Sequence, residues 1–133
     1  MSTENKGPFI ANSNFEDLEG QSKKDNGQCV RLLQVEIRGV PHTSQWRPGI
    51  KVKGNTDIVK GTAIATFFDG RYPSNNTGNH AAIYVGQDAG GIWVIDQFKS
   101  KEKEFQNINR RRLDFGHPYP SNNGDLFYVI KKE

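Results

Sequence analysis

Three residues of this chain have the side chains that nucleophilic catalysis requires, namely Cys29, His80 and Asp96. A cysteine attacks a carbonyl group as its thiolate, and an imidazole that takes the thiol proton generates that thiolate. A carboxylate beside the imidazole holds the ring in orientation. Cys29 is the only cysteine among the 133 residues, so an internal disulfide is excluded. The chain therefore carries a possible nucleophile, base and orienting acid, provided that the fold brings them together.

Cys29 is expected in the first turn of an amphipathic helix. Asp25 and Gln28 stand at the spacing of a capping box, which favours a helix start at this point. A thiol in the first turn feels the positive end of the helix dipole, which favours the thiolate. The alternative is that Cys29 is a small hydrophobic residue buried in the core. Apolar residues recur at nearly helical spacing until an expected end near Gly39, at Val30, Leu32, Leu33 and Ile37.

His80 and Asp96 fall on the two strands of a predicted β-hairpin. Residues 79–85 and 90–98 read as antiparallel neighbours, joined by a turn at residues 87–91. Reflection of the sequence about residue 88 places His80 directly opposite Asp96, on one face of the sheet. The two alanines that follow His80 leave room for the cysteine-bearing helix to pack closely. His42 is a second candidate base, although loop histidines are mostly solvated.

The length and the predicted elements indicate a single domain over residues 1–133 with an α+β fold. In this fold, the cysteine-bearing helix packs on an antiparallel sheet of about five strands. Residues 58–68 and 125–130 are expected to add strands. Residues 40–49 are expected to form an irregular segment anchored by Trp46. Residues 9–18 should form a short packed element, residues 1–7 a disordered lead, and residues 70–78 and 116–124 open polar loops.

Composition excludes several classes of function. A net charge of +3 with interleaved positive and negative residues gives little support for nucleic-acid binding. No stretch approaches the roughly 20 apolar residues of a membrane span, so no membrane association is expected. Three histidines without metal-type spacing and one cysteine argue against a zinc amidase, and no cofactor is expected. The polar N-terminus lacks the apolar core of a signal peptide, which predicts synthesis in the cytoplasm.

Four segments resemble a known group of enzymes: 27–30 (GQCV), 44–49 (SQWRPG), 61–67 (GTAIATF) and 78–84 (GNHAAIY). They resemble the papain-like amidases of the CHAP and NlpC type, and in particular the small peptidoglycan amidase effectors of type VI secretion. The resemblance implies a papain-like fold with Cys29 as nucleophile, His80 as base and Asp96 as the third member. Asp96 stands where CHAP relatives often have Glu. The residues beside these three, Gln28, Asn79 and Gln97, are the implied oxyanion-binding or substrate-binding set.

The same resemblance implies a cysteine amidase that cuts peptide amides in bacterial peptidoglycan, with the cross-link between D-alanine and meso-diaminopimelate as the expected bond. Such an effector would be carried by the secretion apparatus to the periplasm of a target bacterium. A cognate immunity protein would block the Cys29 cleft. Arg110, Arg111 and Arg112 either form a solvated edge or meet the carboxylates of stem peptides.

Three other functions remain open at this stage. One is a non-catalytic basic binding module in which Cys29 is buried. A second is a CHAP-like housekeeping or lytic amidase that cuts within the stem peptide. The third is a cysteine protease of folded proteins, which would share the chemistry but not the substrate.

Overall fold

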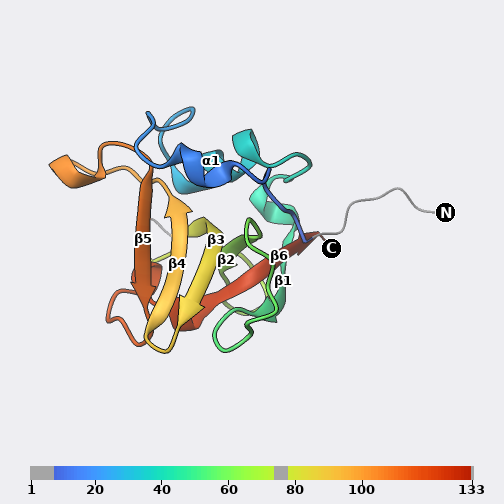
Figure 1. Ribbon diagram of the computed structural model, residues 1–133. Helices are drawn as coiled ribbons and strands as arrows, with labels where there is room; N and C mark the ends of the chain where they lie inside the picture. The colour runs from blue at the N-terminus through green and yellow to red at the C-terminus, as the bar shows by residue number, and fades with distance from the viewer. Residues whose placement is uncertain (1–7, 74–77, 133) are drawn as a thin grey trace.

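The computed structural model describes residues 8–73 and 78–132, and in these residues one α-helix packs on a six-stranded antiparallel sheet. The helix is α1 (Cys29–Glu36). The strands are β1 (Trp46–Lys51), β2 (Ala63–Thr66), β3 (Ala81–Asp88), β4 (Gly91–Asp96), β5 (Asn109–Asp114) and β6 (Phe127–Lys132). They lie in the order β1-β6-β2-β3-β4-β5, which Figure 1 shows from one edge of the sheet to the other.

Short 3₁₀ helices fill several connections: η1 (Phe15–Leu18), η2 (Thr43–Gln45), η3 (Lys103–Phe105), η4 (Pro120–Asn122) and η5 (Gly124–Leu126). None of the helices in residues 8–73 and 78–132 is long and apolar enough to cross a membrane.

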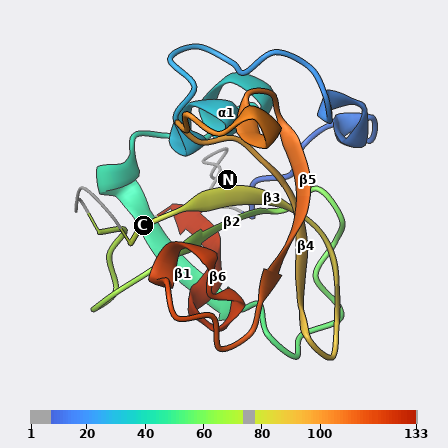
Figure 2. The same ribbon diagram turned by 90° about the vertical axis from the view of Figure 1, so that its left-hand side faces the viewer.

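The sheet is buried on both faces, and β3 shows why. Its residues alternate between two apolar clusters, with Ala81 and Ile83 in the cluster that contains α1 and with Ala82 and Tyr84 in the opposite cluster. Helix α1 lies on the same side of the sheet in both ribbon views (Figures 1 and 2). Its Leu32 and Leu33 belong to the same cluster as Ala81 and Ile83. Of the two alanines that were expected to make room for the helix, only Ala81 faces α1, because Ala82 belongs to the opposite cluster.

The predicted arrangement of a cysteine-bearing helix on an antiparallel sheet is confirmed, but the sheet has six strands instead of about five. Two strands were not assigned from the sequence, namely β1, from a segment that was expected to be irregular, and β5. The strand predicted over residues 58–68 shrinks to β2, because Gly61 has a φ of +97° and breaks the extended conformation. The closing strand starts at Phe127, since Asp125 belongs to η5.

Cys29 lies in the first turn of α1 as predicted, but the helix begins at Cys29 itself and not directly after Asp25, so the predicted capping box is wrong. Gln28 is the N-cap and makes no side-chain capping bond. Asp25 has a φ of +50° and instead accepts a hydrogen bond from Arg31. The helix ends at Glu36, before the expected end near Gly39, because Ile37 is extended.

The segment before α1 packs onto the domain as predicted. Phe9, Phe15 and Leu18 are buried in the α1-side cluster, and Phe15 and Leu18 lie in η1. The disorder predicted for residues 1–7 falls outside the described residues, and so does the part of the predicted 70–78 loop that covers residues 74–77.

The β3–β4 hairpin differs from its predicted register by two residues. Asp88 pairs with Gly91 at the turn, but Ile83 pairs with Ile95 deeper in the hairpin, so Val85 is an extra residue on β3. Asp96 therefore aligns with Ala82, not with His80. His80 and Asp96 still lie on one face of the sheet, as predicted, because residues 80 and 82 point to the same side of a strand. Without the bulge, Asp96 would align with residue 83 and turn away from His80.

Candidate active site

Cys29, His80 and Asn79 line one cleft of about 750 Å³ at the start of β3. Cys29 arrives from the first turn of α1, and His80 directly precedes β3. The Cys29 side chain is half-buried, so it is not the fully buried core residue that the alternative interpretation required. The remaining lining residues are Gln28, Gly78, Phe98, Lys99, Ser100, Glu102, Phe105, Arg111, Ser121 and Asn122.

The structure brings Cys29, His80 and Asp96 into one connected set. His80 Nε2 lies 2.7 Å from Oδ2 of Asp96, and both side chains are buried. Cys29 and His80 also influence each other electrostatically, since His80 lowers the pKa of the Cys29 thiol and Cys29 raises the pKa of His80. Because Nε2 faces Asp96, Nδ1 is the ring nitrogen left for the sulfur. The order thiol, imidazole, carboxylate is that of a nucleophile, base and orienter.

Asp96 is buried but well supplied with hydrogen-bond donors. Besides His80, Arg111 Nε donates to Oδ2 at 2.8 Å and Asn109 Nδ2 donates to Oδ1 at 3.2 Å. Burial raises the pKa of Asp96, but the His80 hydrogen bond and the charges of His80 and Arg111 outweigh it and hold the pKa below its ordinary value. The third member of the set is therefore an ionised carboxylate at neutral pH.

The Cys29 and His80 environments favour a charged pair. Burial raises the pKa of the Cys29 thiol, but the hydrogen bond and charge of His80, and then a hydrogen bond from Tyr72, bring it below the ordinary value. Burial lowers the pKa of His80, but Asp96 and Cys29 raise it to about 9. A thiol pKa below its ordinary value beside an imidazole pKa of about 9 favours a thiolate and imidazolium pair.

A family model described as "Domesticated amidase effector 2" matches residues 2–130. The chain belongs to this amidase effector family. It is similar to the type VI secretion amidase effector 2 protein of Salmonella typhi, at 41% identity over 93% of this chain and 99% of the relative. It is also similar to the domesticated amidase effector 2 of Ixodes scapularis, at 38% identity over 80% of this chain and 72% of that protein.

A solved structure of a type 6 secretion amidase effector 2 superposes on this amidase effector with a TM-score of 0.87. The two chains are 38% identical, and the match covers 96% of each. The resemblance to the small type VI secretion amidase effectors is therefore confirmed, together with the predicted α+β fold class.

Of the neighbouring polar residues that the sequence singled out, Gln28 and Asn79 line the cleft of this amidase effector, but Gln97 does not. Gln97 is completely buried. Its side chain accepts from Lys24 N at 2.7 Å and donates to the carbonyls of Lys24 and Gln28 at 3.0 and 2.8 Å. Gln97 therefore fixes the loop that leads into Cys29, and its expected place in the oxyanion-binding or substrate-binding set is wrong.

The three arginines of β5 divide between the site and the surface. Only Arg111 enters the cleft wall, where its guanidinium also lies 4.6 Å from the Phe98 ring centroid. Arg110 lies over Trp93, and Arg112 pairs with Asp88 and Asp114. Strand alternation could have identified Arg111, because it shares the Asp96 face once the β4–β5 register is known.

The other candidate base, His42, is outside the site. It is exposed and caps η2, where Nδ1 accepts from the Ser44 amide at 3.1 Å. In residues 8–73 and 78–132, no three His, Cys, Asp or Glu side chains are grouped closely enough to hold a metal ion.

Proposed function

We propose that this chain is a cysteine-dependent amidase that hydrolyses peptide amide bonds in bacterial peptidoglycan. The observation that carries the proposal is the placing of Cys29 and His80 at one cleft wall, with His80 hydrogen-bonded to Asp96 and the pKa of the Cys29 thiol lowered by His80. The amidase effectors to which the chain is similar support the reaction class. A binding module with a buried cysteine is not favoured, since Cys29 is half-buried beside the cleft.

In the first half of the reaction, the Cys29 thiolate attacks the amide carbonyl and forms a carbon–sulfur bond. The carbonyl oxygen takes the negative charge, and the Cys29 backbone N–H, one of the unpaired amides at the start of α1, donates to it. The exposed Gln28 side chain at the cleft wall is the second donor in this proposal. The His80 imidazolium then gives its proton to the leaving amine, and the carbon–nitrogen bond breaks.

In the second half, water cleaves the thioester. His80 is now neutral and takes a proton from the water as the water oxygen attacks the carbonyl carbon. The carbon–sulfur bond then breaks, which releases a carboxylate product and returns the thiolate and imidazolium pair. Asp96 holds the ring through Nε2 in both halves, so Nδ1 stays directed at the reacting atoms.

The bond we propose is the cross-link between D-alanine and meso-diaminopimelate. Cross-linked stem peptides carry free carboxylates close to this bond, and the exposed ammonium group of Lys99 at the cleft wall suits such groups. A cleft of about 750 Å³ can take a peptide segment of several residues.

Digestion of purified peptidoglycan sacculi, followed by separation of the released muropeptides, tests the proposal. The parent chain should convert cross-linked dimers to intact tetrapeptide monomers, and Cys29→Ala should release nothing while keeping the parent's circular dichroism spectrum. Shortened monomers would instead mean cleavage within the stem peptide. Hydrolysis by Cys29→Ala would contradict cysteine catalysis, and digestion of folded proteins but not sacculi would indicate a protease.

The proposed setting is type VI secretion, as the names of the similar proteins indicate. The chain would be delivered to the periplasm of a target bacterium, where peptidoglycan lies. A producing cell needs protection from such an enzyme, and an immunity protein that covers the Cys29 cleft would provide it. Expression in the periplasm should lyse cells, whereas expression in the cytoplasm or of Cys29→Ala should not.

A further inference from the structure

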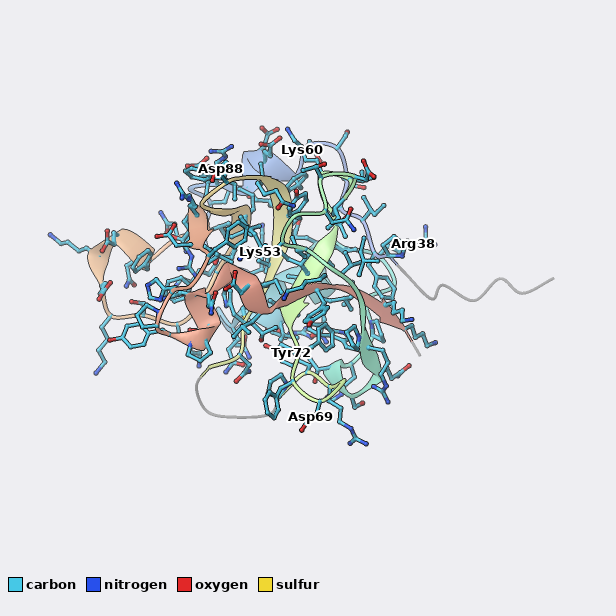
Figure 3. All side chains as sticks on the ribbon, turned by 90° about the horizontal axis from the view of Figure 1, so that it is seen from below. Arg38, Lys53, Lys60, Asp69, Tyr72 and Asp88 are labelled. Carbon is cyan, nitrogen blue, oxygen red and sulfur yellow. The ribbon has the colours of Figure 1, made fainter. Side chains whose placement is uncertain are left out.

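Tyr72 lies beside the sulfur of Cys29, although no sequence pattern marked it. It belongs to the connection between β2 and β3 and is labelled in Figure 3. Its hydroxyl oxygen is 3.7 Å from Cys29 Sγ, within hydrogen-bonding range for sulfur.

The Tyr72 ring is held by packing. It stands edge-on to Trp46, with ring centroids 4.9 Å apart and an interplanar angle of 64°. Trp46 is itself completely buried, and its indole N–H donates to the Pro41 carbonyl at 3.0 Å. A hydroxyl on a ring fixed in this way has little freedom to turn away from the sulfur.

The direction of the hydrogen bond follows from the second partner of the hydroxyl. Asn79 Nδ2 donates to the Tyr72 oxygen at 3.3 Å. A tyrosine hydroxyl carries a single proton. Since Asn79 already occupies an acceptor position of the oxygen, that proton is available to Cys29. A thiolate has no proton to give, so the bond must run from Tyr72 to the sulfur.

We infer that Tyr72 is a further catalytic residue, whose hydroxyl donates a hydrogen bond to the Cys29 thiolate while Asn79 orients that hydroxyl. This inference rests on the proposed function, because it adds a donor to the same nucleophile. It also gives Asn79 a role toward Tyr72, in place of the direct oxyanion or substrate contact expected from the sequence.

The electrostatic surroundings are consistent with a permanent donor. Burial and the charge on Cys29 raise the pKa of Tyr72 far above its ordinary value, so the hydroxyl keeps its proton at every pH at which the enzyme would work. The backbone of Ala81 and the His80 side chain also lower the pKa of the Cys29 thiol, so Tyr72 acts in the same direction as its neighbours.

A donor to the thiolate has two opposite effects on reactivity. It lowers the thiol pKa, which increases the thiolate fraction at a given pH. It also reduces the intrinsic nucleophilicity of that thiolate, because nucleophilicity falls with pKa at a Brønsted slope of about 0.4 to 0.5. Loss of the donor should therefore shift the pH profile and raise the plateau together, which a loss of packing would not do.

The test is the rate of reaction of Cys29 with an aromatic disulfide as a function of pH. Cys29 is the only cysteine, so the probe reports on this residue alone. Tyr72→Phe removes the hydroxyl and keeps the ring against Trp46. Hydrogen bonds to charged groups are strong enough to shift a pKa by about one unit or more. We expect a thiol pKa about one unit higher and a plateau rate about threefold higher.

Tyr84→Phe is the matched control. Tyr84 is also a buried tyrosine with a hydrogen-bonded hydroxyl, which accepts from Gln87 at 3.1 Å, but it lies in the cluster on the far face of the sheet. In Tyr84→Phe, the pKa of the Cys29 thiol and the plateau rate should equal those of the parent. An equal shift in Tyr84→Phe and Tyr72→Phe would overturn the inference, and so would an unchanged profile in Tyr72→Phe.

Asn79→Ala supplies a second line of test. It should raise the thiol pKa in the same direction as Tyr72→Phe but by less, and it should add nothing in the Tyr72→Phe background. Fully additive shifts would contradict the orienting role of Asn79. These titrations use no peptidoglycan, so an inactive parent chain with the expected shifts would reject only the proposed function. An active parent chain with unchanged titrations would reject only the inference.

Discussion

Arg111 Nε lies 2.8 Å from the buried Oδ2 of Asp96, and the two residues come from adjacent strands of the sheet. The same oxygen is 2.7 Å from His80 Nε2, so one carboxylate oxygen serves two cationic groups. A buried carboxylate is costly unless it is paired and hydrogen-bonded. Arg111 therefore stabilises the ionised form of Asp96 on which the orientation of His80 depends.

Arg111→Gln should lower the free energy of unfolding by about 1.5 to 3 kcal/mol, the range for a hydrogen bond to a charged group. Hydrolysis should also fall, by about tenfold, because Asp96 is then held less firmly. Urea denaturation at neutral pH and the rate of muropeptide release measure the two effects.

Arg110→Gln is the control for that experiment, because it makes the same change one residue earlier in the same strand. The Arg110 guanidinium lies 5.2 Å from the Trp93 ring centroid and is exposed, and a contact of this kind contributes about 0.5 to 1 kcal/mol. Equal losses of stability and activity in both variants would contradict a specific role for Arg111.

Gln97→Ala should destabilise the fold by about 2 to 3 kcal/mol and reduce hydrolysis. The variant leaves part-buried backbone groups of the loop before Cys29 without their partner, and each such group costs about 1 to 3 kcal/mol when it is shielded from water. Gln106→Ala is the matched control. Gln106 also donates to two carbonyls, those of Ser100 and Glu102, but it is exposed and should matter little. A Gln97→Ala chain as stable as the parent would contradict the anchoring role.

Local sequence patterns were sufficient to predict the helix that begins at Cys29 and the hairpin that carries His80 and Asp96. Both depend on periodicity within a short stretch of sequence. A two-residue error in the register of a hairpin leaves each side chain on the same face of the sheet. The bulge at Val85 was not visible in the sequence. It nevertheless determines that Asp96 and His80 share a face.

Arg111 and Tyr72 could not be placed from local patterns. Residues 97–108, which include η3, separate β4 from β5, so the register that brings Arg111 to Asp96 depends on tertiary packing. Tyr72 lies in a connection between strands, where no periodicity fixes the direction of a side chain. Its position follows from contacts with Trp46 and Asn79, which are distant or irregularly spaced in the sequence.

His80→Ala should reduce hydrolysis as severely as Cys29→Ala, by about 10² to 10⁴-fold or more, because His80 transfers the proton in both halves of the reaction. Asp96→Asn should reduce it less. The amide can still accept a hydrogen bond from His80, but it no longer carries the charge that favours the imidazolium. Muropeptide release under identical conditions ranks the three variants. Activity in His80→Ala close to that of the parent would exclude His80 as the base.

The Cys29 and His80 pair should also shape the pH dependence of stability. In the folded chain burial lowers the pKa of His80, but Asp96 and Cys29 raise it from 6.5 to about 9. The pKa of Cys29 lies below its ordinary 9.0. Below pH 9 the thiol of the unfolded chain keeps its proton, whereas the folded chain favours a thiolate beside an imidazolium. The proton that the thiol loses in the folded chain offsets the proton that His80 gains, so the pair gives the free energy of unfolding less slope than His80 alone would.

Cys29→Ala should expose the slope that His80 alone produces. Asp96 remains in this variant as a group that raises the pKa of His80 against burial. A group with a raised folded-state pKa contributes its full stability below its unfolded-state pKa and loses it as the pH rises through the folded-state pKa. The free energy of unfolding of Cys29→Ala should therefore fall by about 1 to 2 kcal/mol as the pH rises from the ordinary histidine value toward 9, while that of the parent falls less.

Urea denaturation of both chains at a series of pH values measures this difference. The double variant Cys29→Ala, Asp96→Asn provides the control, because it removes both groups that raise the pKa of His80, and the slope seen in Cys29→Ala should disappear. A Cys29→Ala chain whose stability does not fall with pH would mean that Asp96 alone does not raise the pKa of His80 above its ordinary value.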